Sequence, residues 1–353
     1  MDKISPERTF QFFHIRSLFL LVFAILPGWV VAQKNQVFEL FDGDRIVFVG
    51  NTFVERAIDY GQIEAALTTQ WPQRKFTFRN LGWSGDDPRG RSRRFFGTVE
   101  DGFNHLQTHV EGLAPTVIFV AYGAMESYAG QEGLGDFEKN MEHLLGMLEK
   151  TKARIVILSP CPQEQLPPPM PKVDEHNRNL ELYARSLENI ARKHRYRFID
   201  LFSLMKSSIA DPNTQLTDNG VHLNDTGYKV AAEFILKGMG ISNTPNSLAV
   251  SARGGLVAST GLNVSQVKPL RNGVLVTLKQ DRLRAESPIT VRIQDLFSGS
   301  YTLRLNGRNL GTYSAQRWAS GVEIPWTPDM EQAALLLDTI KAKNELYFHK
   351  WRP

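Results

Sequence analysis

The sequence of 353 residues predicts an α/β protein: a three-layer α/β/α sandwich with a parallel sheet, followed by a smaller β-rich module that ends in a helix. Three observations predict this fold. Apolar runs alternate with amphipathic helical patterns over residues 45–238, short β-type runs follow from about residue 243, and a helical pattern comes last. Strands that are apolar on both faces need helices on both sides of their sheet.

Five apolar runs are expected to form the strands of the parallel sheet, at 45–49, 76–81, 116–121, 154–159 and 196–200. Apolar residues at helical spacing predict the helices between and after them, at 54–70, 99–112, 137–150, 175–194 and 226–238. In sheets of this kind, functional sites form beyond the carboxyl ends of the strands. We therefore expect the turns that follow the strands to carry the chemistry.

The C-terminal part has a different pattern. Runs at 273–278, 289–293 and 301–305 predict strands, with an Asn-Gly turn signal after the last of them, and 329–344 predicts a helix. The aromatic tail beyond that helix is expected to pack back onto the fold. The predicted organisation is therefore a leader at 1–32, an α/β domain at 33–242 and a β-rich module at 243–353.

Residues 1–32 have the organisation of an export signal: a charged start, an apolar run at 18–26 and small residues before a cleavage point. Pro27 and Gly28 interrupt the apolar run where a membrane span would have to continue, which disfavours an uncleaved anchor. We expect cleavage after Ala32, no stable membrane span afterwards, and a periplasmic or extracellular location in a bacterium.

Composition excludes several other classes of protein. The formal net charge of +4 is too small to predict nucleic-acid binding. Cys161 is the only cysteine, so an intramolecular disulfide and a cysteine metal cluster are excluded. The histidines show no metal-ligand spacing, and a glycine-rich phosphate loop is absent from the sequence. We expect no metal and no cofactor, and the sequence does not predict an oligomeric state.

Four short motifs follow strands or end the α/β region, and they hold the candidate chemistry. A hydroxyl at a strand-to-helix turn and a histidine on a late loop are how several hydrolases assemble a nucleophile and its base. A helix cap is the structural alternative for the first motif, since Asn51 or Thr52 is followed by Glu55. The motifs are Gly50-Asn51-Thr52, Asn80-Leu81-Gly82-Trp83-Ser84-Gly85-Asp86, Gly123-Ala124-Met125-Glu126 and Asp218-Asn219-Gly220-Val221-His222.

These motifs resemble the four blocks of the GDSL/SGNH hydrolase family, over about residues 41–240. The resemblance implies an SGNH, flavodoxin-like fold and hydrolysis of an acyl or acetyl ester of a carbohydrate or a lipid. It implies Thr52 as nucleophile and His222 as base, with Asp218 or Asn219 orienting the imidazole. The N–H groups of Thr52 and Gly82 would hold the oxyanion.

The remaining residues of the motifs are expected around the substrate. Ser84 is also an alternative nucleophile, because it adds a second hydroxyl at the same edge of the sheet. The residues expected to bind substrate are Asn51, Ser84, Met125 and Glu126.

Three departures from the family pattern predict lowered or altered activity. Thr52 replaces serine, and its methyl group crowds the attack. Met125 replaces an asparagine whose amide would donate to the oxyanion, a donor worth on the order of 10² to 10³ in rate. Asn219 replaces an aspartate and cannot stabilise an imidazolium as a carboxylate does. A protein that has kept the fold and binds glycan or cell-wall polymer is therefore the alternative, and a structural surface protein is a third class.

Overall fold

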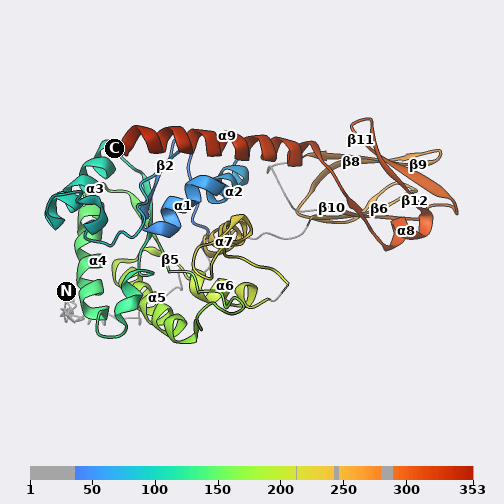
Figure 1. Cartoon of the computed structure of the whole chain (residues 1–353). Helices are drawn as coiled ribbons and strands as arrows, with labels where there is room; N and C mark the ends of the chain where they lie inside the picture. Colours follow the sequence, from blue (N-terminus) through green and yellow to red (C-terminus); the bar gives the residue numbers. More distant parts are fainter. Residues whose placement is uncertain (1–35, 212, 242–245, 280–288, 353) are drawn as a thin grey trace, which may run out of the picture. The chain divides into compact units, whose positions relative to one another are not determined.

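The computed structural model describes residues 36–211, 213–241, 246–279 and 289–352. Its first part is built on a five-stranded parallel sheet with the strand order β2-β1-β3-β4-β5 (Figure 1). This is the doubly wound order of flavodoxin-like proteins, and it confirms the predicted sandwich. The strands are β1 (Arg45–Gly50), β2 (Thr77–Asn80), β3 (Val117–Ala121), β4 (Arg154–Leu158) and β5 (Arg197–Ile199).

The interior strand β1 is buried on both faces. Ile46 and Phe48 point into one hydrophobic core, and Val47 and Val49 point into the other, because successive side chains of a strand alternate between faces. Helices cover both cores. One core is formed with α3 (Val99–Leu113), α4 (Leu134–Glu149) and α5 (Asp174–His194), and the other with α1 (Thr52–Tyr60), α2 (Gln62–Gln70), α6 (Leu201–Ile209) and α7 (Asp225–Gly238).

Two helical details differ from the sequence-based expectation. The single helix predicted at 54–70 is two helices, because Gly61 adopts the left-handed conformation at φ +66° and separates α1 from α2. Helix α6 was not predicted. Two short 3₁₀ helices, η2 (Arg91–Arg93) and η3 (Glu126–Ala129), lie in the loops that follow β2 and β3.

The C-terminal region has its own core around the buried Trp318. A four-stranded sheet has the order β13-β10-β6-β7, and two hairpins, β8 with β9 and β11 with β12, complete the set. The predicted strands at 273–278, 289–293 and 301–305 correspond to β9, β10 and β11. The elements are β6 (Asn246–Ser251), β7 (Leu256–Thr260), β8 (Asn263–Leu270), β9 (Gly273–Lys279), β10 (Ile289–Gln294), β11 (Ser300–Leu305), β12 (Arg308–Ser314), α8 (Ala315–Ser320) and β13 (Val322–Ile324).

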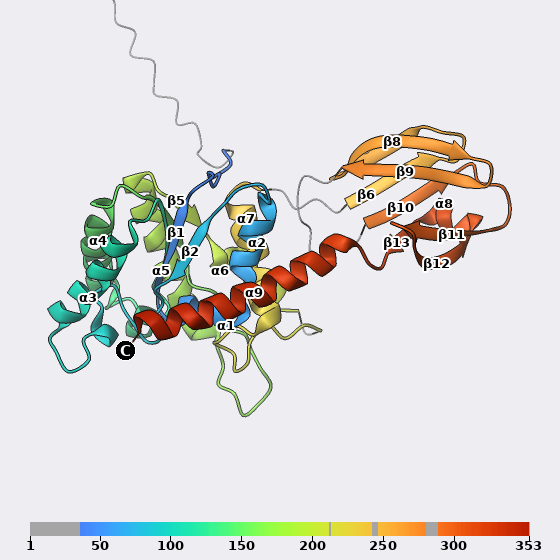
Figure 2. The same cartoon turned by 90° about the horizontal axis from the view of Figure 1, so that it is seen from above.

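The last helix, α9 (Pro328–Trp351), packs against α1, α2 and β2 of the sandwich (Figure 2). Lys343 forms an ion pair with Glu64 of α2 at 2.6 Å. Trp351 is buried and joins the core that contains α3, α4 and α5. The aromatic tail thus packs back onto the fold, and α9 becomes part of the surface of the sandwich.

None of the helices in the described residues is long and apolar enough to cross a membrane. The predicted export signal at 1–32 lies outside the described residues.

Candidate active site

Two cavities meet beyond the carboxyl end of β1. The smaller has a volume of about 360 Å³ and the larger about 820 Å³. Thr52, Arg56 and His222 line both of them. The structure therefore brings the predicted nucleophile and base, 170 positions apart in the sequence, to the junction of two cavities.

Thr52 is the first residue of α1, and the turn before it explains its position. A Cβ atom on Gly50 would lie 2.5 Å from the carbonyl oxygen of Ala121, so only glycine allows β1 to end this close to β3. Asn51 is the N-cap of α1, and its Oδ1 accepts a hydrogen bond from the Phe53 N–H at 3.2 Å. Asn51 is thus a buried cap that also lines the smaller cavity. Its neighbour Thr52 stands at the positive end of the α1 dipole, which favours a developing negative charge.

The backbone N–H of Gly82, the expected oxyanion donor, is bound within its own loop. The Gly82 N–H donates to Asn80 Oδ1 at 2.8 Å, so it is already bound away from the cavities. A Cβ atom on Gly82 would lie 2.2 Å from the Glu55 nitrogen, which shows that this glycine serves the close packing of the loop on α1. The Gly85 N–H instead donates to Thr52 Oγ1 at 3.1 Å. Gly85, the next glycine of the same motif, is therefore the donor that faces the hydroxyl.

The loop that carries His222 is held by a buried carboxylate that sequence reasoning missed. Glu164 accepts hydrogen bonds from the Leu216 and Thr217 N–H groups and from the Thr217 hydroxyl. The loop is closed by the Asp218 N–H, which donates to the His222 carbonyl at 2.8 Å. These bonds fix the backbone of the loop, so the imidazole is presented from a rigid turn.

Asn219 fixes the tautomer of His222. Its Oδ1 accepts from the N–H groups of Val221 and His222, at 3.1 and 2.9 Å, which orients the amide. The Nδ2 group then faces His222 Nδ1 at 3.2 Å. Because an amide nitrogen only donates, Nδ1 accepts, and the ring proton of the neutral imidazole sits on Nε2. A general base needs the opposite tautomer, with a free Nε2 and an Nδ1–H that donates to a carboxylate.

Asp218 does not take the place of that carboxylate. It forms an ion pair with Arg56 at 2.6 Å, and its side chain is 49% exposed. Burial lowers the pKa of His222 below its usual 6.5, and the positive charge of Arg56 lowers it further, while Asp218 opposes the shift. His222 is thus held neutral, and Asn219 alone orients its ring.

The third motif contributes differently from the expectation. Met125 is exposed and lines the smaller cavity, as predicted for a substrate contact. Glu126 lines neither cavity: its Oε2 accepts from the Gly123 N–H at 2.8 Å, and its Oε1 is buried without a hydrogen-bond partner among the described residues. Burial raises the pKa of Glu126 to about 7. The carboxyl group of Glu126 thus turns inward, and the substrate contact expected for it stays a prediction.

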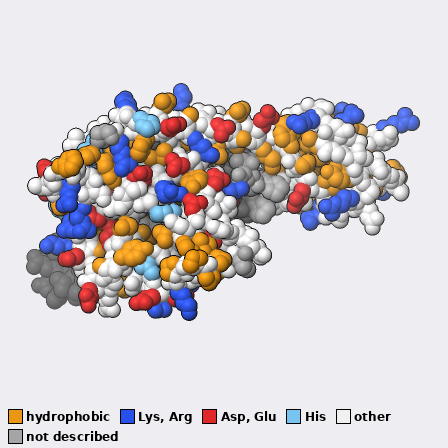
Figure 3. All heavy atoms as spheres, viewed as in Figure 1, with side chains coloured by type: hydrophobic (Ala, Val, Ile, Leu, Met, Phe, Trp, Pro, Cys, Tyr) orange, Lys and Arg blue, Asp and Glu red, His pale blue; other side chains and the backbone are white. Residues whose placement is uncertain are grey.

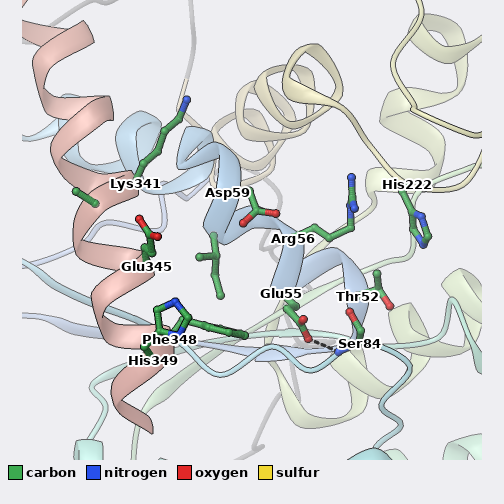
Figure 4. A pocket seen from close by; sticks show the side chains of 12 residues that line it. Thr52, Glu55, Arg56, Asp59, Ser84, His222, Lys341, Glu345, Phe348 and His349 are labelled. Atoms are coloured by element: carbon green, nitrogen blue, oxygen red, sulfur yellow. Dashed lines mark hydrogen bonds between the residues drawn. The ribbon is translucent and has the colours of Figure 1, made fainter. Parts of the chain in front are cut away.

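Ser84 lines the larger cavity close to Thr52 (Figure 4). Its backbone N–H donates to the Glu55 carboxylate, which also binds Arg352 at 2.9 Å. The sequence predicted Glu55 only as part of a helix cap, and it gave no signal that Arg56 or the residues of α9 would line this cavity. Ser84 thus remains the second hydroxyl at the site.

The smaller cavity has mainly apolar and aromatic walls. The rings of Tyr128 and His176 stack at 3.9 Å on one side. Cys161 is also in the wall, and burial raises the pKa of its thiol to about 12, so the thiol stays protonated and unreactive. Within the described ranges, no group of three or more His, Cys, Asp or Glu side chains could hold a metal ion.

A family model described as the GDSL-like Lipase/Acylhydrolase family matches residues 44–230. No curated protein matches the chain. A solved structure of BT4096, a gut microbial diltiazem-metabolizing enzyme, is 19% identical, with a TM-score of 0.69 over 89% of this chain and 80% of that chain. This likeness concerns the fold, and it extends beyond the residues that the family model matches.

Two shorter structures match the chain more weakly. LAE5, an alpha/beta hydrolase enzyme from the metagenome of Lake Arreo, is 18% identical, with a TM-score of 0.46 over 58% of this chain and 99% of its own. Axe2, an acetylxylan esterase from Geobacillus stearothermophilus, is 16% identical, with a TM-score of 0.44 over 58% of this chain and 99% of its own.

Proposed function

We propose that this protein, which belongs to the GDSL-like lipase/acylhydrolase family, hydrolyses carboxylic esters at the site that Thr52 and His222 share. One observation carries the proposal: Thr52 Oγ1 accepts the Gly85 N–H at the junction of two cavities that His222 also lines. A hydroxyl at a helix N-terminus, beside a backbone donor and a histidine, is the arrangement that acyl transfer requires. The substrate class we propose is an acyl or acetyl ester of a carbohydrate or a lipid.

The chemistry follows from these positions. Thr52 Oγ1 attacks the carbonyl carbon while His222 Nε2 takes the hydroxyl proton. The N–H groups of Thr52 and Gly85 hold the oxyanion of the tetrahedral intermediate. The C–O bond to the alcohol then breaks, and His222 returns the proton to the leaving oxygen. Water, activated by His222, hydrolyses the acyl ester on Thr52 and restores the free hydroxyl.

This cycle is expected to be slow in the natural sequence. The Asn219 amide places the ring proton on the nitrogen that has to accept the proton of Thr52. The imidazole has to change tautomer before it acts, and the imidazolium then lacks a facing carboxylate.

The direct test uses 4-nitrophenyl acetate and the mature chain. Turnover that is lost in Thr52→Ala and in His222→Ala supports the proposed mechanism. An active Thr52→Ala beside an inactive Ser84→Ala would move the nucleophile to Ser84. Turnover that is indistinguishable from buffer at every pH tested would overturn hydrolysis altogether.

The Asn219 contact also favours a second function, in which the protein holds a glycan or a cell-wall polymer in the same cavities without cleaving it. Such a binder needs the cavities but not a competent base. This second function predicts that Thr52→Ala and His222→Ala still bind the polymer, and that neither these variants nor the natural protein cleaves an ester.

We also propose that the protein is exported and cleaved after Ala32. The charged start, the apolar run at 18–26 and the small residues before the cleavage point support this. Amino-terminal sequencing of protein recovered from the periplasm or the medium would read from Gln33. A protein that stays with the membrane and keeps its first residues would show that the segment is an anchor.

A further inference from the structure

The larger cavity is a groove between α1 and α9. Figure 4 shows Thr52, Ser84 and His222 at one end of it, with the side chains of α9 along the opposite wall. The residues that line it are Thr52, Glu55, Arg56, Ile58, Asp59, Ser84 and His222 from the sandwich and Lys341, Ala342, Glu345, Phe348 and His349 from α9.

The α9 wall is fixed to the sandwich at three levels. At Gly61, a Cβ atom would lie only 3.1 Å from Ile340, so the backbone of the α1–α2 turn touches the helix. In the middle, Lys343 and Glu64 form their ion pair at 2.6 Å. At the end, the Arg352 guanidinium lies over the Trp83 ring at 3.8 Å. Both walls of the groove are therefore held in place by packing and ion-pair contacts between α9 and the sandwich.

The groove is lined by charged side chains that have no polar partner among the described residues. Among the described residues, the side chains of Asp59, Lys341 and Glu345 have neither a hydrogen bond nor an ion pair. In Figure 3 the exposed side of α9 shows basic, acidic and histidine side chains close together. Two free carboxylates accept hydrogen bonds and one free ammonium donates them, which is what a ligand with several hydroxyl groups requires.

An aliphatic alcohol would fit this groove poorly. Its chain would remove water from the charges of Asp59, Lys341 and Glu345 without returning hydrogen bonds, and each such loss is costly. A sugar would bond to these groups through its hydroxyls and lay its C–H face against Phe348, which lines the same groove. Clefts that combine an aromatic wall with a few polar groups are typical ligand sites, and a volume of about 820 Å³ lies within their usual range.

We propose that the α1–α9 groove binds the sugar part of an acylated carbohydrate, while the smaller apolar cavity holds the acyl group. The inference rests on the proposed hydrolysis for its orientation, because the scissile ester would lie at the junction, next to Thr52. It assigns α9 a direct part in substrate recognition and selects the carbohydrate over the lipid.

The first experiment compares two substrates with the same acyl group, 6-O-acetylglucose and hexyl acetate. We expect kcat/KM to favour the sugar ester, and Glu345→Gln and Asp59→Asn each to reduce that preference about tenfold, as the loss of a hydrogen bond to a charged group does. Asp338→Asn is the matched control, since this exposed carboxylate of α9 does not line the groove, and it should leave the preference unchanged. Hydrolysis with no preference for the sugar ester would overturn the groove assignment and leave the proposed function standing.

The second experiment does not need turnover. Titration of Thr52→Ala with cellotetraose and xylotetraose by calorimetry should detect binding that Glu345→Gln weakens and Asp338→Asn does not. Sugar binding without ester hydrolysis in the natural sequence would support the groove and overturn the proposed function. Failure of both oligosaccharides to bind, together with measurable hydrolysis of hexyl acetate, would overturn the groove.

Discussion

The Asn219 amide nitrogen lies 3.2 Å from Nδ1 of His222, in the position where a carboxylate oxygen would accept the ring proton. Replacing that nitrogen by an oxygen turns the hydrogen-bond donor that faces Nδ1 into an acceptor. In Asn219→Asp, one carboxylate oxygen keeps the two backbone N–H groups and the other accepts from Nδ1–H. We expect kcat on 4-nitrophenyl acetate to rise by about 10- to 1000-fold. The reverse change, from aspartate to asparagine in a catalytic triad, lowers kcat because it holds the histidine in the wrong tautomer.

Asp218→Asn is the control for this gain. Its carboxylate binds Arg56 and not the imidazole, so its loss should change kcat less than about threefold. An Asn219→Asp variant that is as slow as the natural protein would show that the tautomer of His222 does not limit the reaction.

Thr52→Ser should accelerate acyl transfer. The change removes the methyl group that restricts χ1 and crowds the carbonyl, and it keeps the hydroxyl that accepts the Gly85 N–H. We expect an increase of several-fold in kcat, measured with the same chromogenic ester. Thr52→Val, which has the same shape and lacks the hydroxyl, should be inactive; comparable activity in both variants would exclude Thr52 as the nucleophile.

Arg56 should set the acid limit of activity. A lowered pKa keeps His222 neutral down to a pH below 6.5. Because the neutral ring is the form that accepts a proton, kcat/KM should be flat above pH 6.5 and should fall only below it. Arg56→Gln removes a positive charge beside the ring, so the pKa of His222 should rise and the acid limb of the profile should move to higher pH. Arg74→Gln removes an equally charged group that pairs with Glu39 instead, and its profile should match that of the natural protein.

Arg352 should act as a positioning residue for the oxyanion donor. It binds Glu55 at 2.9 Å, and Glu55 holds the Ser84 N–H, next to Gly85 in the chain. In Arg352→Ala we expect kcat to fall about five- to tenfold with little change in KM, because the Gly85 N–H contributes in the transition state.

Arg352→Lys should recover part of that loss, since lysine keeps the charge. Lys350→Ala, at an exposed position of the same helix, should have no effect. A rise in KM at constant kcat in Arg352→Ala would instead place Arg352 in ground-state binding.

The buried pair Arg93–Asp86 should dominate the stability of the loop after β2. The Arg93 Nε lies 2.5 Å from Asp86 Oδ2, and both side chains are fully buried. Arg93→Met would leave a buried carboxylate without its partner, at a cost of about 3–5 kcal/mol in the free energy of unfolding. Arg94→Met, at the exposed neighbouring position, should change that free energy by less than about 0.5 kcal/mol; equal effects in urea denaturation would contradict the assignment.

The order of strands and helices was predictable because burial on both faces leaves a continuous apolar run that the sequence displays. The positions of Thr52 and His222 were predictable for a related reason, since parallel strands end at one edge of the sheet. The break at Gly61 was not, because an amphipathic pattern continues unchanged across a single glycine with φ +66°. Periodicity reports which side of a helix is apolar and not where its axis turns.

The donor groups of the site were harder to predict. Gly82 and Gly85 stand in one motif, and the choice between them depends on which N–H the Asn80 side chain occupies. The wall formed by α9 was unpredictable for a different reason. It depends on the packing of residues some 290 positions from Thr52, and no local pattern encodes such a contact.

That packing has a consequence for synthesis. Translation proceeds from the amino end, so Thr52 and His222 emerge from the ribosome long before Glu345 and Arg352 do. A nascent chain that has reached α7 already contains Thr52 and His222, but one side of the larger cavity is still open to solvent. A chain that ended before residue 328 would contain the Thr52 hydroxyl and the His222 imidazole but would lack the helix that, in our proposal, selects the sugar alcohol. On that proposal, substrate selectivity is the last property that the chain acquires during synthesis.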